Sequence, residues 1–470
     1  MPRKNRRIVL EDLEVIDAGA RGKAVAKAPD GRVVFITNAV PGDVVTVQTH
    51  KKRKSYYEGT AIAFSRLSDK RADPVCSHFG VCGGCKWQHM AYEHQLFFKQ
   101  KEVQNNLERL GGISLPEINP ILGSEKQYWY RNKMEFSFSD SKWLTREQIE
   151  SEEPIANRNG VGFHIPGKWD KILDIDTCHL QRDPSNAIRK FIKRTAETLG
   201  MSFFNVRAQE GMLRTLMIRT SSIGEIMVLI QFYEDPMEKR EELLDAIRTE
   251  FPDITSLLYV INTKGNDTLY DQEILCHSGR DHIFEAMEGL RFKINAKSFY
   301  QTNSEQAYEL YKVTREFAGL TGNELVYDLY TGTGTIAQFV AKEARKVVGV
   351  EAVPEAIEAA QENAQLNEID NVAFYVGDMK KIFTSEFVDT HGIPDVVITD
   401  PPRDGMHADV VNQLLSLGAP RIVYVSCNSA TQARDLSLLD ALYEVKKVQP
   451  VDMFPQTHHV ENVVLLQLKK

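Results

Sequence analysis

The sequence predicts a multidomain α/β protein with an N-terminal OB-like β-barrel, a central α+β region and a C-terminal doubly wound, mostly parallel sheet. Three patterns predict it. Residues 8–65 show short alternating strands broken by glycine and proline turns, residues 127–300 mix short strands with helices, and from about residue 306 strands and helices alternate regularly. The 470 residues suffice for about two to four domains, each with its own core.

Charge is distributed unevenly along the chain. The net charge is −8, yet residues 1–60 hold 12 basic and 7 acidic residues, gathered at Arg3–Arg7 and at 51–54, where Tyr56 and Tyr57 follow. Basic groups beside aromatic rings suit RNA, because cations neutralise phosphates and rings stack on bases. The alternative interpretation is a solvated surface loop.

The composition excludes several classes of protein. No apolar run approaches a membrane span, and the N-terminus lacks the apolar segment of a secretory signal. Six cysteines are too few for a disulfide scaffold, which favours a reducing compartment. We therefore expect a cytoplasmic monomer that does not contact membranes.

The central region begins with a helix and continues as an α+β pattern. Residues Glu93–Leu110 have helical apolar spacing and stop at Gly111 and Gly112. Helices such as Ser185–Leu199 separate short apolar strands. The predicted strands are Met134–Phe138, Gly160–His164, Arg214–Arg219, Ile226–Phe232 and Ser256–Ile261.

The C-terminal region alternates strands with helices such as Ile336–Ala344 and Pro354–Asn367, the pattern of a doubly wound sheet. Open sheets of this kind bind ligands at the carboxyl ends of their strands. The predicted strands are Leu325–Leu329, Lys346–Glu351, Val372–Tyr375, Asp395–Asp400, Arg421–Cys427 and Val463–Leu468.

Glycines and acids at these strand ends indicate the ligand. Gly332 and Gly334 follow the first strand and precede a helix, so the backbone can approach a ligand closely. Asp328 would repel a pyrophosphate but can face a cation, which favours S-adenosylmethionine over a dinucleotide. Glu351 ends the next strand, where an acid accepts hydrogen bonds from ribose hydroxyls. Asp378 follows the third strand, where it can receive the adenine amino group.

Cys427 ends one strand, and Asp400 ends the strand before it in sequence, 27 residues earlier. A free cysteine is commonly a small buried hydrophobe. Beside a methyl-donor pocket, however, a thiolate can add to C6 of a pyrimidine and make its weakly nucleophilic C5 reactive. A base must then remove the C5 proton. Glu461, just before the last apolar strand, is the candidate base; its alternative is a solvated turn acid.

Four cysteines are candidate metal ligands: Cys76, Cys82, Cys85 and Cys178. In a reducing compartment, closely spaced thiols indicate metal binding rather than disulfides. Zinc with His78 and His89 as further ligands is one possibility, and a Cys₄-held iron–sulfur cluster suits the spacing better. The spacing disfavours redox catalysis, so we expect a structural or RNA-positioning role. Cys276 has no partner and is expected in the core.

Three C-terminal motifs together resemble the RNA uracil-C5 methyltransferase family: Asp-Pro-Pro-Arg at 400–403, Val-Ser-Cys-Asn-x-Ala-Thr at 425–431 and His-x-Glu at 459–461. Residues 31–47 resemble the TRAM domain, an OB-like RNA-binding module. With the cysteine cluster, the resemblance runs over essentially the whole chain and is closest to the 23S ribosomal RNA branch. Residues 130–133 match a family stretch near the target base.

The resemblance implies three domains: a TRAM-like RNA-binding β-barrel over 1–66, a central α+β domain with a [4Fe-4S] cluster over 67–300, and a class I methyltransferase domain over 301–470. Residues 93–125 are candidates for packing on the methyltransferase domain. The resemblance also implies that Cys427 is the nucleophile and Glu461 the base. The positions where the family binds S-adenosylmethionine are Gln301, Tyr330, Thr335, Glu351, Asp378 and Asp400. The implied cluster ligands are Cys76, Cys82, Cys85 and Cys178.

The implied substrate is an unpaired or flipped uridine in RNA. Enzymes of the transfer-RNA T loop typically lack both the TRAM module and the cluster, which favours 23S rRNA. Some cluster-bearing relatives nevertheless modify transfer RNA, so a T-loop uridine remains the alternative. An amino-methylating RNA enzyme is disfavoured by Arg403, since such enzymes need an aromatic residue there. A non-catalytic RNA-binding protein is disfavoured by the intact pair of Cys427 and Glu461.

Overall fold

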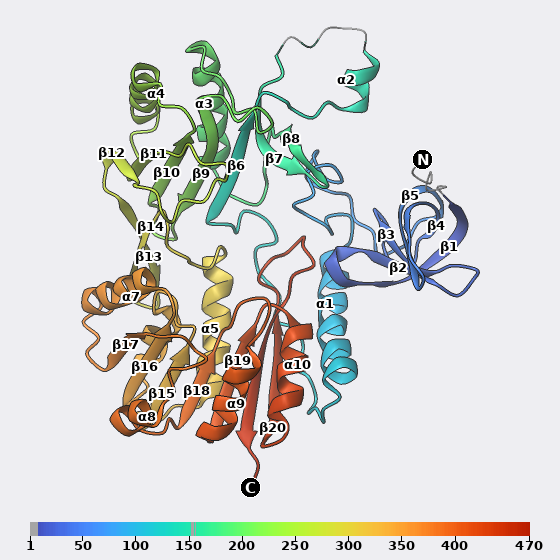
Figure 1. Ribbon diagram of the computed structural model, residues 1–470. Helices are drawn as coiled ribbons and strands as arrows, with labels where there is room; N and C mark the ends of the chain where they lie inside the picture. Colours follow the sequence, from blue (N-terminus) through green and yellow to red (C-terminus); the bar gives the residue numbers. More distant parts are fainter. Residues whose placement is uncertain (1–7, 152–154, 156) are drawn as a thin grey trace.

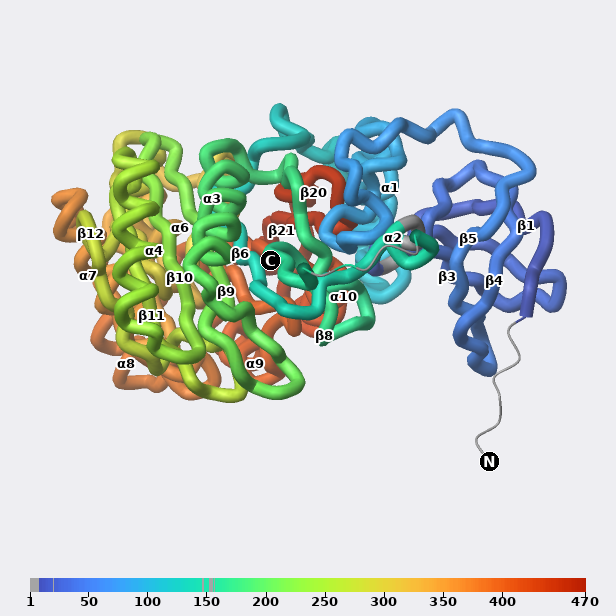
Figure 2. The backbone as a smooth tube through the Cα atoms, turned by 90° about the horizontal axis from the view of Figure 1, so that it is seen from above, coloured from blue at the N-terminus to red at the C-terminus, as the bar shows by residue number. Residues whose placement is uncertain are grey.

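The computed structural model describes residues 8–470 apart from 152–154 and 156, so the basic cluster Arg3–Arg7 lies outside the described residues. Figure 1 shows three parts: a barrel at one side, a sheet with two long helices above, and a second sheet flanked by helices below. Seen from above in Figure 2, the barrel lies at one end of the molecule. Within the described ranges, no helix is long and apolar enough to cross a bilayer.

The N-terminal part is a closed five-stranded barrel, which confirms the predicted β-barrel. Alternate residues of its short strands point inward, and Val34, Ile36, Val45 and Val47 are fully buried. Closure leaves no free sheet edge. The strands are β1 (Val9–Ala18), β2 (Ala24–Lys27), β3 (Val33–Thr37), β4 (Val44–Lys52) and β5 (Tyr56–Arg66), in the order β1-β2-β3-β5-β4.

The central part is a seven-stranded sheet with helices α3 (Ser185–Thr198) and α4 (Met237–Glu250) packed on it. Helix α3 buries Ile188, Ile192 and Ala196, which recur every four residues and so share one face. A short helix, α2 (Arg146–Glu150), precedes β7. The strands, in sheet order, are β12 (Leu275–Gly279), β11 (Ser256–Ile261), β10 (Ile226–Phe232), β9 (Leu213–Thr220), β6 (Lys133–Ser139), β7 (Gly160–Ile165) and β8 (Lys168–Asp174).

The expectation that Cys276 lies in the core is wrong. Its side chain is exposed. The cause is its place on β12, the edge strand of the central sheet, where the residue pairs only with β11.

The C-terminal part is a second seven-stranded sheet with helices on both faces, as predicted. Its three central strands are buried on both sides and therefore read as continuous apolar runs. In sheet order they are β17 (Val372–Val376), β16 (Lys346–Glu351), β15 (Leu325–Leu329), β18 (Val396–Thr399), β19 (Arg421–Ser426), β21 (Glu461–Leu468) and β20 (Tyr443–Val451). The helices are α5 (Ser304–Ala318), α6 (Thr335–Ala341), α7 (Pro354–Leu366), α8 (Ser385–His391), α9 (Ala408–Leu417) and α10 (Ser429–Leu439).

A two-stranded ribbon, β13 (His282–Met287) and β14 (Leu290–Asn295), joins the two sheets. Its apolar side chains, Phe292 among them, belong to one continuous core that includes Leu229 of the central sheet and Val326 of the C-terminal sheet. The backbone amide of Lys293 also donates to Asn363 Oδ1 on α7 at 2.7 Å. The two sheets are therefore parts of a single packed unit.

Helix α1 (Tyr92–Asn106) continues as a π-helical turn, Leu107–Gly111, and packs against the C-terminal sheet and α10. Val103 and Leu107 enter the same core as the helices of that domain. On its other side, Lys101 of α1 pairs with Asp17 of the barrel at 2.8 Å. Helix α1 thus lies between the barrel and the C-terminal domain (Figure 1).

The shared core gives a stability prediction. Phe292→Ala should lower the free energy of unfolding by about 3–5 kcal/mol, because the ring is buried between both sheets and its loss leaves a cavity. Both sheets should unfold in one transition at a lower denaturant concentration, measured by circular dichroism and tryptophan fluorescence. Leu438→Ala, at a side chain that is 47% exposed on α10, is the control and should have little effect. A variant in which the C-terminal sheet unfolds separately would contradict the single core.

Candidate active site

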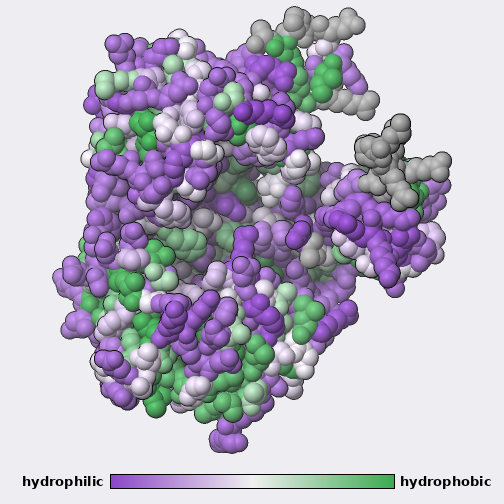
Figure 3. All heavy atoms as spheres, viewed as in Figure 1, coloured by the Kyte–Doolittle hydropathy of each residue, from purple (hydrophilic) through white to green (hydrophobic). Residues whose placement is uncertain are grey.

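The candidate site lies along one edge of the C-terminal sheet. Strands β15, β16, β18 and β19 are parallel and end there, and β21 is antiparallel to β19, so it begins there. The C-terminus lies at the far end of this domain in Figure 1, which places the start of β21 toward the central part. Figure 3 shows that the surface is hollowed between the central part, the C-terminal domain and the barrel.

Strand register brings the two candidate catalytic residues together. Ser426 of β19 is opposite Asn462 of β21. Continuing this antiparallel register by one residue places Cys427 opposite Glu461. The pKa of the Cys427 thiol is raised to about 11, first by burial and then by the charges of Glu461 and Asp400, while Arg403 lowers it. A thiol, two carboxyls and a guanidinium therefore share one site.

The two carboxyls of this site are held in a protonated or easily protonated state. Burial, followed by the charge of Asp400, raises the pKa of Glu461 to about 8, against the opposing charge of Arg403. Burial and then Asp328 raise the pKa of Asp400 to about 7. Within the described ranges, the side chains of Asp400 and Glu461 have no hydrogen-bond or ion-pair partner. A cationic ligand in this crevice would provide the missing partner and lower the pKa of both carboxyls.

Backbone contacts fix Arg403 beside the thiol. Its carbonyl oxygen accepts hydrogen bonds from Asn428 Nδ2 at 3.0 Å and from Thr431 Oγ1 at 3.1 Å. Asn428 directly follows Cys427, so the Asp-Pro-Pro-Arg segment and the cysteine segment are tied to each other. The exposed guanidinium of Arg403 can then act on both Cys427 and Glu461.

The glycine loop after β15 has the geometry of a ligand cradle. Gly332 has φ +53°, and a Cβ there would meet nothing within 4 Å, so its backbone faces open space. Gly334 has φ +75°, and a Cβ there would come within 2.9 Å of Ala360. Asp328 lies behind this loop, where it accepts hydrogen bonds from Thr331 Oγ1 and the amide of Ala337, and burial raises its pKa to about 7. Asp328 therefore fastens the loop to helix α6.

Three of the predicted cofactor residues surround that loop. Tyr330 follows β15 with φ +61°, a left-handed conformation that is unusual outside glycine and is typical of functional sites. Its pKa is raised to about 12 by burial and by the charges of Asp435, Glu351 and Asp378. Glu351 accepts a hydrogen bond from the amide of Gly332 at 3.2 Å. Tyr330, Glu351 and Asp378 thus lie around the same loop.

The remaining two cofactor candidates are placed differently. Thr335 is buried as the first residue of α6, and its Oγ1 lies 3.4 Å from Thr333 Oγ1. Gln301 lies just before α5, and its carbonyl oxygen accepts a hydrogen bond from Asn132 Nδ2 at 2.8 Å. Two residues further, Asn303 Nδ2 donates to the Met453 carbonyl at 2.9 Å, in the loop that leads to Glu461. Gln301 is thus tied to the central part and lies two residues from a contact with the loop that precedes Glu461.

The four cysteine candidates come together between the barrel side and the central sheet. The charges of Cys76, Cys82 and Cys178 all act on Cys85, whose pKa is raised to about 12, mainly by burial. An apolar cluster including Ile165, Leu173 and Ile175 packs against Cys82 and Cys178. In the part of the chain that the structure describes, no three His, Cys, Asp or Glu side chains are arranged to hold a metal ion.

The sequence motifs do not reveal Lys99, Asp452 and Gln456. Lys99 and Asp452 form a fully buried ion pair with a 2.6 Å separation, and Gln456 is buried with φ +68°. Only the spacing of Lys99, Val103 and Leu107 hints that this lysine belongs to a buried helix face.

The sheet order, the glycine loop and the acid-lined edge define an α/β methyltransferase domain. Comparison with known proteins agrees. Residues 279–469 match the tRNA (uracil-5-)-methyltransferase family model. An uncharacterized RNA methyltransferase of Bacteroides thetaiotaomicron is 59% identical over 96% of this chain and all of its own length, and one of Porphyromonas gingivalis is 55% identical over 97% of this chain and 99% of its own.

A solved structure extends the match to the whole fold. The tRNA (uracil-54, C5)-methyltransferase of Pyrococcus abyssi, in complex with S-adenosyl-L-homocysteine, superposes with a TM-score of 0.74 at 28% identity and covers 97% of this chain and 100% of its own. The chain belongs to the RNA uracil-5-methyltransferase family.

The electrostatics of the site predict that Glu461→Gln stabilises the protein in a pH-dependent way. The folded-state pKa of Glu461 is raised to about 8, so the protonated carboxyl contributes stability in acid that is lost as the pH rises through that value. Glutamine cannot ionise. In urea unfolding, the free energy of unfolding of the variant should equal that of wild type at about pH 4. At about pH 8.5 it should be roughly 2–4 kcal/mol higher than that of wild type. Glu358→Gln, exposed on α7, is the control. An equal difference at both pH values would contradict this account.

Proposed function

We propose that this protein transfers a methyl group from S-adenosylmethionine to C5 of a specific uridine in RNA through a covalent adduct between Cys427 and C6 of the base. The observation that carries the proposal is the β19–β21 register, which sets Cys427 opposite Glu461, with Asp400 and Arg403 acting on both. An amino-methylating enzyme would need neither a thiol nor a base at these positions.

Each residue then has a defined task. The Cys427 thiolate adds to C6, and the electrons of the C5–C6 double bond move toward O4, which makes C5 nucleophilic. S-adenosylmethionine, when bound, supplies the electrophilic methyl group that C5 takes up. The Glu461 carboxylate removes the C5 proton, the double bond re-forms, and the C6–S bond breaks to release the thiolate. Asp400 and Asp328 keep the crevice attractive to a sulfonium cation.

Protonation must change before the reaction. In the free site the thiol has a pKa of about 11 and Glu461 one of about 8, so both groups are largely protonated at neutral pH. A cation bound beside Asp400 would lower both pKa values, because it offsets the carboxylate charges that raise them. Arg403 acts in the same direction. We therefore infer that cofactor binding activates both residues.

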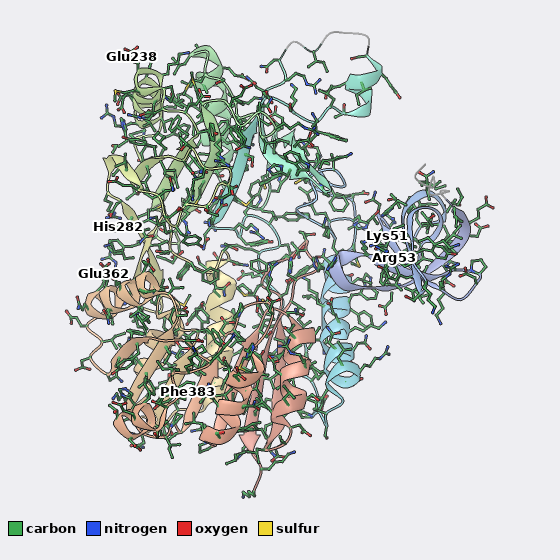
Figure 4. All side chains as sticks on the ribbon, viewed as in Figure 1. Lys51, Arg53, Glu238, His282, Glu362 and Phe383 are labelled. Carbon is green, nitrogen blue, oxygen red and sulfur yellow. The ribbon has the colours of Figure 1, made fainter. Side chains whose placement is uncertain are left out.

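The barrel is the proposed RNA-binding part, and residues 1–66, 67–300 and 301–470 the proposed domains. Lys52, Arg53 and Lys54 are exposed at the end of β4 and the following turn. The Lys51 ammonium lies 5.7 Å from the centre of the Tyr56 ring. Figure 4 shows Lys51 and Arg53 on the barrel, outside the C-terminal domain. Such a basic and aromatic surface suits contacts with phosphates and stacked bases.

The favoured target is a uridine of 23S rRNA, on the basis of the resemblance of the barrel and the cysteine spacing to that branch. A transfer-RNA T-loop uridine is the second candidate. It is favoured by the structure of the Pyrococcus abyssi tRNA (uracil-54, C5)-methyltransferase, which matches 97% of this chain, barrel included.

We further propose that Cys76, Cys82, Cys85 and Cys178 hold a [4Fe-4S] cluster. The donor set fits: the four thiols act electrostatically on one another, and the amides of Gly84, Leu180 and Gln181 donate hydrogen bonds to Cys82 and Cys178. A cubane distributes its four thiolates over four irons, so it does not need the ligands to converge on one ion. The cluster would hold the 76–85 loop against the central domain.

The covalent mechanism is tested with 5-fluorouridine-substituted RNA, in which fluorine replaces the proton that Glu461 removes. Incubation with S-adenosylmethionine should give a denaturation-resistant protein–RNA complex with either 23S rRNA fragments or transfer RNA, and the RNA that reacts identifies the target. Cys427→Ala should give none, and Cys276→Ala, altered at an exposed thiol on β12, should react like wild type. A complex that persists in Cys427→Ala would refute the mechanism.

The cluster is tested by metal analysis after anaerobic purification. About four irons and four acid-labile sulfides per chain are expected, because a cubane has that composition. Cys178→Ser should lower both, whereas Cys276→Ser should leave them unchanged. Stoichiometric zinc in place of iron would instead support the zinc alternative.

A further inference from the structure

The loop between β20 and β21 leads directly into Glu461 and is fixed at its start by a buried ion pair. Asp452 Oδ1 accepts hydrogen bonds from Lys99 Nζ at 2.6 Å and from the amide of Phe454 at 3.0 Å. Its other oxygen accepts from the Tyr92 hydroxyl at 2.8 Å. Lys99 Nζ also donates to the Phe454 carbonyl at 3.2 Å. Both charged side chains are fully buried.

The middle of the same loop is fixed through Gln456. Its amide donates to Gln95 Oε1 at 2.9 Å, and its side-chain oxygen accepts from Gln95 Nε2 at 3.0 Å. Its carbonyl accepts from the amides of Lys86 and Trp87, at 2.8 and 3.0 Å. The φ of +68° at Gln456 is unfavourable for a side chain with a Cβ and persists only where surrounding contacts enforce it.

Apart from Phe454, which belongs to the loop itself, all of these partners lie outside the methyltransferase domain. Tyr92, Gln95 and Lys99 are on one face of helix α1 or at its start, and Lys86 and Trp87 precede that helix. The same helix ends beside the nucleophile, because Asn106 Nδ2 donates to Ser429 Oγ at 2.8 Å, two residues after Cys427. Helix α1 therefore contacts the chain two residues after Cys427 and, at Asp452 and Gln456, the loop that precedes Glu461.

We propose that Gln95 and Lys99 are positioning residues that hold the Asp452–Gln456 segment so that Glu461 can reach the C5 proton. This inference rests on the proposed function, because it assumes that Glu461 removes the C5 proton. The distance between base and proton must be correct within a fraction of an ångström, and a displacement of about 1 Å can slow a step 100-fold. Neither residue touches the reacting atoms; each acts through the loop.

The proposal predicts a specific kinetic defect. A displaced Glu461 leaves attack by Cys427 and methyl uptake intact but slows proton removal, so the methylated covalent adduct should accumulate on ordinary RNA. A loss of folding would have the opposite effect, since it would abolish the adduct. Adduct release and adduct formation therefore separate a positioning role from a structural one.

The experiment compares full-length Gln95→Ala, Lys99→Met and Glu461→Gln with wild type in single turnovers with ordinary RNA and labelled S-adenosylmethionine. Gln95→Ala removes four side-chain hydrogen bonds, two of them to Gln456 and two to the carbonyls of Trp87 and Met90. It leaves no buried lone charge, so it serves if Lys99→Met fails to fold. Both should release the methylated adduct roughly 10- to 100-fold more slowly than wild type, with KM for the cofactor unchanged. Gln104→Ala is the matched control, because this exposed side chain on α1 bonds to Glu108.

The outcomes are distinguishable. An adduct that accumulates in Glu461→Gln but not in Gln95→Ala would overturn the positioning role. A parallel fall in adduct formation and thermal stability, without slow release, would overturn it too. If Glu461→Gln itself forms no adduct on ordinary RNA, the proposed function fails rather than this inference. Slow release of the methylated adduct by Gln95→Ala, with normal release by Gln104→Ala, would support the positioning role.

Discussion

The arrangement of the candidate site depends on one reversal of strand direction. Strand β21 runs antiparallel between β19 and β20 in an otherwise parallel sheet. Without that reversal, the residue at the start of β21 would lie at the opposite edge from the ends of β15, β18 and β19. With it, a residue from the last 10 of the chain stands beside Cys427. The loop before β21 must consequently approach the same crevice, and its conformation becomes part of the site.

Burial of acids without cationic partners is the second organising constraint. Asp328, Asp400 and Glu461 all have raised pKa values, and burial is the largest cause for each. Such groups lower the stability of the empty protein at neutral pH, since each would ionise more readily in the unfolded chain. The same groups favour binding of a cation, because its charge would offset theirs. At this edge of the C-terminal sheet, the buried acids therefore lower the stability of the protein and raise its affinity for a cation.

Much of this could be predicted from the sequence because local patterns determine it. Strands such as Lys346–Glu351 are uninterrupted apolar runs, and the residue that ends each run lies at the crevice by topology alone. The sequence does not predict strand β20, because it is an edge strand whose mixture of lysines, a glutamine and a proline lacks an apolar run. Lys99 and Gln456 were not foreseeable either. Their partners are more than 350 positions away in sequence, and a lysine is ordinarily a surface residue.

The interface between the two sheets differs from the interface between the barrel and the rest of the protein. This difference affects which parts of the chain can be exchanged during evolution. The ribbon β13–β14 merges the central and C-terminal sheets into one core. The barrel instead meets the rest through a small cluster of Ala18, Val40, Trp87, Met90 and Phe98, together with single ion pairs such as Lys101–Asp17. A part attached in this way can be lost, gained or exchanged by recombination without repacking the catalytic unit. The two sheets share one core, so neither can be replaced without repacking the other.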